Sequence, residues 1–292
     1  MSSGLLAKIF SWDWKVIPDR LEGDRRGLPC PSAEDVSNGS HGNGGLQSYF
    51  LESLKNEDLC RLNNLLPWSC YVLDERGRRF GKPWSVGKRG TPQRIPDRRI
   101  IELDRRFPLR DLVVLEVGCF EGVHTVALAR LARRVLAADS RVENVVKTIV
   151  RCAAFRTSPE VFVWNVEEGI PKEPDLTCDI LHHVGVLYHL ADPVRHLRQV
   201  LPVVKKGVML DTHIAREESA VDNYISEGRS YRYMRYTEGG RKDPFSGMAK
   251  HAKWICEEDL VGLLHESGFS RVEVTERRPE RNGPRVLIFA SR

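Results

Sequence analysis

Polar side chains that can hold a ligand or move a proton follow five short apolar runs of the chain. They are two carboxylates, one amide and two imidazoles, at Glu116, Asp139, Asn165, His183 and His213. Carboxylates accept hydrogen bonds from hydroxyl and ammonium groups, an amide both donates and accepts, and a histidine can take up a proton near neutral pH. Together these groups suit a ligand that carries hydroxyls and a positive charge.

A glycine turn after the first run, Val113–Val117, distinguishes two kinds of nucleotide ligand. A dinucleotide site uses G-x-G-x-x-G, so that pyrophosphate lies on a helix N-terminus. Here Gly118 and Gly122 are present, but Phe120 stands where the middle glycine would be, and Glu116 puts negative charge where phosphate would lie. The turn therefore favours a phosphate-free cationic ligand such as S-adenosylmethionine over a nicotinamide dinucleotide. A strand-turn-helix without any ligand is the simpler alternative, and the later runs argue against it.

The spacing of the later runs supports a nucleoside site. Asp139 follows Glu116 by 23 residues, about the interval at which such folds place the carboxylate that binds ribose hydroxyls. Asn165 follows the third run directly, so its carbonyl oxygen could bond the amino edge of adenine, or its side chain could form an Asx turn.

Strand and helix patterns alternate from about residue 112 to residue 213, which predicts a parallel sheet with helices on both faces. The fold class is therefore α/β, doubly wound and Rossmann-like, with the ligand across the carboxyl ends of the strands. A terminal antiparallel pair is predicted near the end of the chain. The predicted strands are residues 113–117, 135–139, 161–164, 179–183, 208–213, 271–275 and 286–290.

Two motifs carry a family resemblance: E-V-G-C-F-E-G at 116–122 and D-I-L-H-H-V-G-V-L-Y-H-L-A-D-P at 179–193. With the acid after the second strand, they resemble class I S-adenosylmethionine-dependent methyltransferases over about residues 78–275. The segment G-V-L-Y-H is most similar to the branch that contains the tRNA uridine-5-oxyacetic acid carboxymethyltransferase. The resemblance implies S-adenosylmethionine as cofactor and a seven-stranded sheet, mostly parallel, with the last strand antiparallel.

The resemblance also implies which residues touch the cofactor. In that family the matching residues frame the methionine end, hold the ribose, flank the adenine and lie beside the sulfonium. Their counterparts here are Glu116, Gly118 and Gly122 for the methionine end, Asp139 for the ribose, Asn165 and Val166 for the adenine, and His183 and Val184 for the sulfonium; the adjoining Cys119, Phe120 and Ser140 complete the predicted set.

Methyl transfer needs an in-line approach of the acceptor, and a base helps when the acceptor must lose a proton. His183 is the first candidate for that base and His213 the second, because each ends a predicted strand. Tyr188 and His189 could orient the acceptor, although His189 could merely cap the turn. His182 is expected to alternate away from His183 into packing.

The chain departs from the tRNA enzyme after the Tyr-His pair. An arginine-rich stretch of that enzyme is replaced by Leu190-Ala191-Asp192. The sequence therefore predicts plain methyl transfer to a nitrogen or oxygen of a small molecule, in specialised biosynthesis, with RNA modification like that of a tRNA wobble-uridine (carboxy)methyltransferase as the alternative. A non-catalytic cofactor-binding subunit is a further rival. No metal is predicted, because Gly185 and Tyr188 stand where ligands would be wanted.

Composition and the outer segments set the remaining expectations. The net charge of +5 is mild, no run of 18 apolar residues is present, and the seven cysteines show no metal-ligand spacing, so a cytoplasmic protein without membrane contact is predicted. A basic cluster between residues 76 and 99 could bind RNA, but a solvated face is the commoner explanation. The oligomeric state is left open.

Four segments are expected. Residues 1–45, rich in Gly, Ser, Asn and Pro, predict a flexible segment, and residues 46–110 a helical extension or cover. Residues 111–292 form the methyltransferase domain, in which 215–253 interrupts the sheet pattern. Because a long insertion at the ligand end of such a sheet usually covers the site, it is predicted to be a lid, although its tyrosines could simply pack.

Overall fold

The computed structural model of the chain describes residues 49–82 and 90–292. Contacts between Cα atoms divide the chain into residues 1–38 and 39–292, and every element described here belongs to the second unit. The segment predicted to be flexible, 1–45, lies outside the described residues. None of the described helices is both long and apolar enough to cross a membrane.

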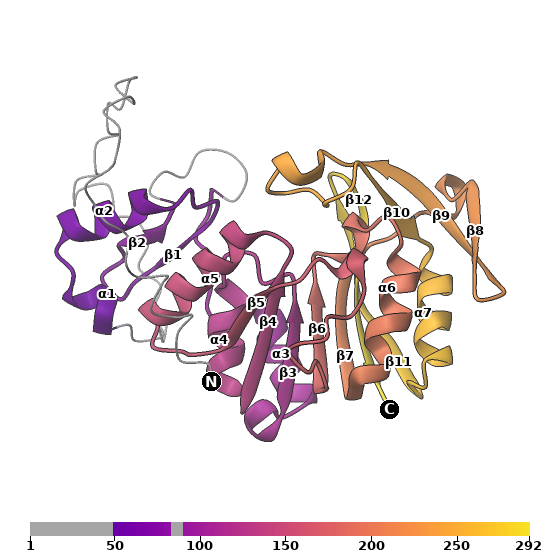
Figure 1. Ribbon diagram of the computed structural model, residues 1–292, viewed down its shortest axis with the longest axis horizontal. Helices are drawn as coiled ribbons and strands as arrows, with labels where there is room; N and C mark the ends of the chain where they lie inside the picture. Colours follow the sequence, from indigo (N-terminus) through magenta and orange to yellow (C-terminus); the bar gives the residue numbers. More distant parts are fainter. Residues whose placement is uncertain (1–48, 83–89) are drawn as a thin grey trace. The chain divides into compact units, whose positions relative to one another are not determined.

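The described residues contain a central sheet of seven strands in the order β11-β12-β7-β6-β3-β4-β5 (Figure 1). β12 runs antiparallel to both of its neighbours, and the other strands are parallel to one another. This arrangement confirms the predicted α/β class and the antiparallel last strand. The strands are β3 (Val113–Val117), β4 (Arg134–Asp139), β5 (Glu160–Val163), β6 (Cys178–Val184), β7 (Val204–His213), β11 (Arg271–Glu280) and β12 (Gly283–Ser291).

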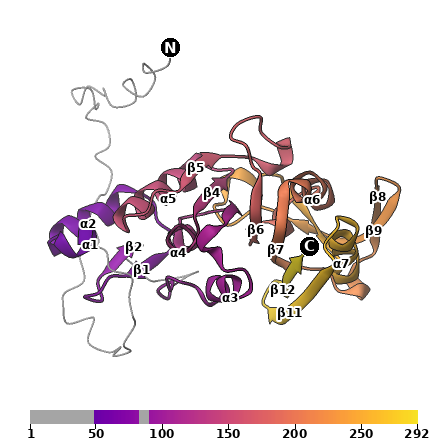
Figure 2. The same ribbon diagram turned by 90° about the horizontal axis from the view of Figure 1, so that it is seen from below.

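Helices cover both faces of this sheet (Figure 2). One apolar core joins the sheet to α6 (Pro193–Val200) and α7 (Glu257–Glu266). A second core, on the opposite face, joins it to α3 (Arg98–Arg106) and α4 (Val123–Leu131), with α5 (Val142–Ala154) beside α4. Because the chain order reverses between β3 and β6, a crevice is expected at the carboxyl ends of these two strands.

Strand alternation decides which face each residue of the central strands meets. In β6, Leu181 belongs to the core under α6, and Ile180 to the core under α4. His183 therefore points to the α6 face and His182 to the α4 face, because successive side chains of a strand alternate. In β3 the same rule places Glu116 on the α4 face, opposite His182 in the parallel register.

The segment before the sheet is more than the helical cover predicted for residues 46–110. It contains α1 (Tyr49–Ser53) and α2 (Asn56–Leu65), and also a hairpin of β1 (Tyr71–Leu73) and β2 (Arg79–Gly81). The buried Glu121 of the glycine turn binds this hairpin, because its carboxylate accepts hydrogen bonds from Ser69 N at 2.7 Å and Cys70 N at 3.0 Å. The extension is thereby fixed to the turn after β3.

The predicted lid, 215–253, is mostly an antiparallel sheet of its own. Among the described residues it contains β8 (Asp222–Ser226), β9 (Arg229–Thr237) and β10 (His251–Ile255). Tyr231 is fully buried in the core under α6, and its hydroxyl accepts a hydrogen bond from Arg198 at 2.8 Å. Tyr224 and Tyr233 pack against the same core, so these three tyrosines pack rather than cover a ligand.

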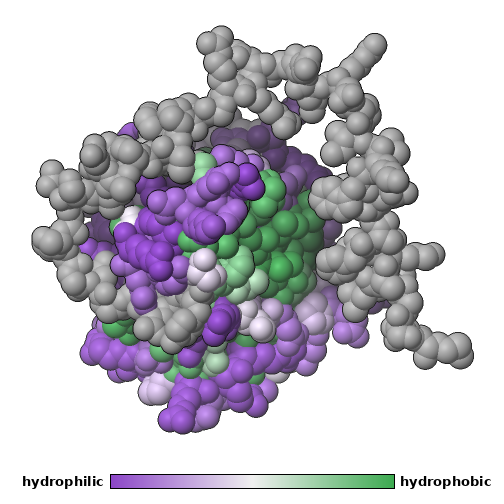
Figure 3. All heavy atoms as spheres, turned by 90° about the vertical axis from the view of Figure 1, so that its left-hand side faces the viewer, coloured by the Kyte–Doolittle hydropathy of each residue, from purple (hydrophilic) through white to green (hydrophobic). Residues whose placement is uncertain are grey.

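One exposed apolar stripe lies on α5. Val142, Val146 and Ile149 are 51%, 41% and 48% exposed, and their spacing places them on one face of the helix. Figure 3 views the molecule from the α1 and α2 side and shows apolar side chains gathered between hydrophilic areas. α5 is therefore apolar on part of its outer face as well as on its buried face.

Candidate functional site

A cavity of about 790 Å³ lies at the carboxyl ends of the strands, where the chain order reverses. Its volume is in the upper part of the range of about 300–1,000 Å³ that small-molecule sites occupy. Most of the predicted cofactor residues line it: Glu116, Gly118, Cys119, Phe120, Asp139, Ser140, Asn165, Val166 and Val184. Gly122 and His183 do not, whereas Tyr188, His189 and His213 do.

The two glycines of the turn are packed closely against other residues of the protein, so that a side chain at either position would collide with them. Gly118 has φ +80°, and a Cβ there would lie 2.1 Å from Cγ2 of Val186. Gly122 has φ +78° at the start of α4, and a Cβ there would lie 3.0 Å from Cα of Thr148 on α5. Both positions therefore require glycine for their left-handed backbone and for close packing, which explains why Gly122 supports the turn without reaching the cavity.

Asp139 ends β4 with both carboxylate oxygens already oriented. Oδ2 accepts a hydrogen bond from Phe120 N at 3.0 Å, and Oδ1 accepts from Arg141 N at 2.9 Å and from Asn144 Nδ2 at 3.0 Å. Burial raises the pKa of Asp139 above its ordinary value, although these donors oppose the rise. A fixed carboxylate that is 8% exposed and lines the cavity can accept further hydrogen bonds from a pair of hydroxyls.

Asn165 adopts the Asx turn that the sequence left open. Its Oδ1 accepts a hydrogen bond from Glu167 N at 3.3 Å, and its Nδ2 donates to Glu168 Oε1 at 2.8 Å. The side chain thus caps the short helix at Val166–Glu168. Asn165 and Val166 both line the cavity. Their contact with adenine stays a prediction.

Glu116 lies at the inner wall of the cavity with one oxygen available. Its Oε2 accepts a hydrogen bond from Thr125 Oγ1 at 2.6 Å, and Oε1 has no hydrogen-bond donor among the described residues. Burial raises the pKa of Glu116 to about 7. A buried carboxylate with a vacant lone pair is a site for an ammonium group, as the methionine end of the predicted cofactor requires.

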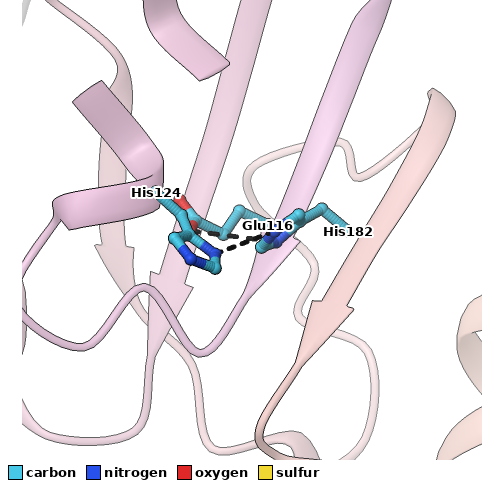
Figure 4. Close-up of side chains that lie close together, drawn as sticks. All are labelled: Glu116, His124 and His182. Atoms are coloured by element: carbon cyan, nitrogen blue, oxygen red, sulfur yellow. Dashed lines mark hydrogen bonds and ion pairs between the residues drawn. The ribbon is translucent and has the colours of Figure 1, made fainter. Parts of the chain in front are cut away.

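His124 and His182 complete a polar cluster with Glu116, and the three side chains point toward one another (Figure 4). Nδ1 of His124 lies 3.2 Å from Nε2 of His182, whose Nδ1 lies 3.9 Å from Glu116 Oε1. On its other side His124 Nε2 lies 3.2 Å from Arg99 Nη2. Asp97 Oδ2 lies 3.8 Å from the same nitrogen of His124, so this end of the cluster meets both a guanidinium and a carboxylate.

This cluster also has the composition of a zinc site, one glutamate and two histidines. One ligand atom from each residue lies within 4.8 Å of the others. However, the facing nitrogens of the two histidines are engaged with each other, and the guanidinium of Arg99 adds a positive charge beside His124. The cluster therefore fits a hydrogen-bonded chain better than a metal centre, and the absence of a metal stays a prediction.

Chelation tests that prediction. Treating the purified protein with EDTA should leave its affinity for S-adenosylmethionine unchanged, because no contact in the cluster requires a cation. The measurement is calorimetric titration before and after chelation, together with elemental analysis. About one zinc per chain, with weaker cofactor binding after its removal, would contradict it.

The raised pKa of Glu116 gives a pH-dependent prediction. Glu116 is mostly protonated below about pH 7, and only the ionised form pairs with an ammonium. Cofactor affinity should therefore fall about tenfold for each pH unit below 7, as expected when one proton is released on binding. Calorimetry between pH 5.5 and 7.5 in buffers of different ionisation enthalpy measures this release. Glu116→Gln should bind weakly at every pH, and a flat profile in the unmodified protein would refute the assignment.

His183 is wrongly predicted as the base and as the neighbour of the sulfonium. It is fully buried, its Nε2 lies 3.0 Å from Nε2 of His196 on α6, and burial lowers its pKa to about 4. The reason is strand alternation, which turns His183 into the core while its neighbour Val184 reaches the cavity. His182, expected to pack, instead bonds to His124 near Glu116.

His213 lines the cavity as part of an aromatic stack. Its ring lies 4.7 Å from that of Trp254 at an angle of 10°, and its Nδ1 lies 3.1 Å from the carbonyl oxygen of Pro284. Burial and then the nearby charge of Arg285 lower its pKa. This neutral, stacked ring is suited to forming the wall of an acceptor site.

His189 lines the cavity on the short helix Leu187–His189, with Nδ1 2.8 Å from Glu238 Oε1. Glu238, which follows β9, is 7% exposed and also accepts hydrogen bonds from Ser246 Oγ and, at 2.9 Å, from Gly247 N. Burial alone would raise the pKa of Glu238, but the bonds from His189 and Ser246 bring it below its ordinary value. The ionised Glu238 fixes the Nδ1 proton of His189, so Nε2 is the nitrogen able to accept a proton.

Sequence reasoning missed Glu238. It lies 49 residues after His189 in the chain, and no local pattern pairs the two. The available signal was the length of the insertion, since loops that reach over a ligand crevice often carry functional groups. Of the insertion, residues 236–239 and 243–248 contribute to the wall of the cavity, and Trp254 just after it does so as well.

The chain is similar to known methyltransferases. A family model described as a methyltransferase domain matches residues 115–210. The chain is 24% identical over 173 residues to the ubiquinone biosynthesis O-methyltransferase of Ruegeria pomeroyi, covering 59% of this chain and 65% of that protein. It is 34% identical over 135 residues to the tRNA U34 carboxymethyltransferase of Ruthia magnifica, covering 44% of this chain and 40% of that one. The chain thus spans just under two thirds of the first relative and well under half of the second.

A solved structure supports the fold over a longer stretch. The N-terminal domain of EvdMO1, crystallised with SAH and D-fucose, superposes with a TM-score of 0.63 at 23% identity, covering 80% of this chain and 95% of that one. At this identity the likeness establishes the shared fold. Residues 115–210 thus match a methyltransferase domain, and the chain is similar to known methyltransferases over a longer stretch. The carboxylates Glu116 and Asp139 line the cavity of this part of the chain.

Proposed function

We propose that the protein transfers the methyl group of S-adenosylmethionine to a hydroxyl oxygen or an amine nitrogen of a small molecule. The observation that carries this proposal is the His189–Glu238 pair, 2.8 Å apart, on the wall of the cavity that also holds Asp139 and Glu116. A histidine oriented by a carboxylate is the arrangement that a general base requires.

The chain's own residues have separate roles in this reaction. When bound, S-adenosylmethionine supplies an electrophilic methyl group. Asp139 accepts hydrogen bonds from the ribose hydroxyls, and Glu116 pairs with the ammonium. His189 Nε2 takes the proton that the acceptor loses, and Glu238 stabilises the resulting imidazolium. Closure of the cavity by residues 236–248 helps to hold the acceptor in line.

Two observations favour a small molecule over RNA. In the described part of the basic cluster, Arg78 pairs with Asp74 at 2.7 Å and Arg98 with Glu276, so much of its charge is neutralised within the protein. The name of the ubiquinone relative also points to an oxygen acceptor. The tRNA relative keeps RNA modification as the second candidate.

Labelled cofactor tests the proposal directly. The full chain is incubated with methyl-labelled S-adenosylmethionine and either the small-molecule or the RNA fraction of a cell extract. Label should enter the small-molecule fraction and be lost with His189→Ala. Label in RNA alone, with polynucleotide binding that weakens steeply with salt, would favour RNA modification. Cofactor binding without any turnover would favour a non-catalytic subunit.

The location of the protein stays a prediction. Among the described residues, Cys60, Cys119, Cys152, Cys178 and Cys256 are free thiols. Cys119 lines the cavity, but burial raises its pKa well above the ordinary value, so it packs as a neutral thiol rather than acting as a nucleophile. Reduced thiols are consistent with the proposed cytoplasmic setting.

A further inference from the structure

The part of the cavity beyond the cofactor turn begins at Gly185. A Cβ on Gly185 would lie 3.6 Å from Arg285 Nη2 and 3.9 Å from the hydroxyl of Tyr188. On the other side, a Cβ on Gly118 would lie 3.9 Å from the carbonyl oxygen of Val184. Arg285 and Tyr188 therefore lie directly beside the turn that frames the methionine end of the cofactor, where an acceptor must lie.

Aromatic rings form one wall of this acceptor region. Tyr236, Trp254 and His213 make a continuous stack, with ring centroids 4.4 Å and 4.7 Å apart. Tyr188 meets His213 edge-on at 4.6 Å, and its carbonyl oxygen accepts the Trp254 Nε1 hydrogen bond at 2.9 Å. All four residues line the cavity, where Tyr188 and Tyr236 are partly exposed and Trp254 and His213 are buried behind them. A wall fixed in this way favours a flat, unsaturated ring over a flexible chain.

Guanidinium groups form the adjoining wall. Arg99 and Arg278 each bond to Asp211 at 2.9 Å, and Arg285 also bonds to it. Asp211 is fully buried and is not part of the cavity wall, whereas the three arginines are. Several positive groups are thus held toward the cavity by a carboxylate behind them.

One of these three arginines, Arg285, and a further arginine, Arg281, retain free donors. Nε of Arg285 donates to Asp211, but its Nη2 has no acceptor among the described residues, and its guanidinium lies 5.2 Å from the ring of Tyr188. Arg281, at the tip of the β11–β12 hairpin, is exposed, lines the cavity and has no ion pair with any described residue. Glu280, on the same wall, forms an ion pair with Arg285 Nη1 at 3.8 Å, which is beyond hydrogen-bond distance and leaves the donors of Nη2 free.

We propose that the methyl acceptor is a planar ring that carries a carboxylate, with the ring against Tyr188 and the aromatic stack and the carboxylate on Arg285 and Arg281. This inference rests on the proposed methyl transfer, because it assigns the substrate class of the same cavity. A guanidinium with free parallel donors is suited to bidentate binding of a carboxylate. A neutral ring would leave Nη2 of Arg285, whose side chain is 12% exposed, without a charged acceptor, and a cationic ring would meet like charge.

The experiment compares acids with matched amides. The full chain, saturated with S-adenosylhomocysteine, is titrated with hydroxybenzoates, hydroxycinnamates and hydroxynaphthoates and with the corresponding amides, while Trp fluorescence reports binding. At least one acid should bind about 10- to 100-fold more tightly than its amide, as expected for a charge-assisted pair. Arg285→Gln should abolish the preference and Arg281→Gln should reduce it. Arg271→Gln, on an exposed residue of β11 away from the cavity, is the matched control and should change nothing.

The outcomes separate this inference from the proposed function. If the unmodified protein does not bind S-adenosylhomocysteine, the proposed function itself is overturned. Normal cofactor binding without preference for any acid over its amide would overturn the substrate class alone. Tight binding of uridine monophosphate or an oligoribonucleotide, with no binding of the ring acids, would also overturn it in favour of an RNA acceptor. Retention of the acid preference in Arg285→Gln would overturn the assignment of the carboxylate to this guanidinium.

Discussion

Replacing Asp139 with alanine is expected to weaken S-adenosylmethionine binding on the order of 100-fold or more. The carboxylate can accept hydrogen bonds from two ribose hydroxyls, and hydrogen bonds to a charged group contribute about 1.5–3 kcal/mol each. Calorimetric titration of the cofactor measures the loss. Unchanged affinity would contradict the assignment of Asp139 to the ribose hydroxyls. It would also contradict the placement of the cofactor across the ends of β3 and β4.

Asp139 also binds the backbone of Phe120 and Arg141, so its variants need a structural control. Asp139→Asn keeps the size of the side chain and one acceptor oxygen, and should bind more tightly than Asp139→Ala. Asp175→Ala removes an exposed acid outside the cavity and should leave affinity unchanged. Thermal unfolding of each variant shows whether weaker binding reflects the site or the fold.

Replacing His189 with alanine is expected to lower kcat about 10²- to 10⁴-fold, the usual contribution of a general base. Glu238→Gln should give a smaller loss, because the imidazole remains but its Nδ1 proton and its positive form are no longer stabilised. Steady-state kinetics with the acceptor found by labelling measures both effects, and cofactor affinity should stay unchanged. The double variant should be no slower than His189→Ala alone, since the two residues act as one unit.

Variants of His183 and His213, the two histidines that the sequence favoured as the base, are the comparison for the His189 variants. His183→Gln should keep kcat within about threefold, because this buried ring lies outside the cavity and any cost should appear in stability. His213→Asn should affect the acceptor's KM more than kcat, because His213 is stacked on Trp254 in the wall. Full activity of His189→Ala with loss in His213→Asn would transfer the role of base to His213.

The sequence by itself determined the strand-turn-helix order and the positions of two carboxylates, Glu116 and Asp139, at the ends of strands that meet at the cavity. Apolar runs that end in Glu116 and Asp139 are local signals, because each strand carries its own hydrophobic pattern and its own end. The left-handed conformations of Gly118 and Gly122 could be anticipated for the same local reason. The parallel order then followed from alternation of strands and helices.

Only the tertiary structure decided which polar residues reach the cavity. His182 and His183 are neighbours in the chain, but the pleat of β6 directs one toward Glu116 and the other into the core beside His196. Glu238 meets His189 because an insertion folds back over the strand ends, and Asp211 gathers arginines from α3 and the last hairpin. Such contacts join segments that are far apart in the chain. A sequence pattern gives the spacing of residues along one strand or helix, but it does not show which faces of different elements pack against each other.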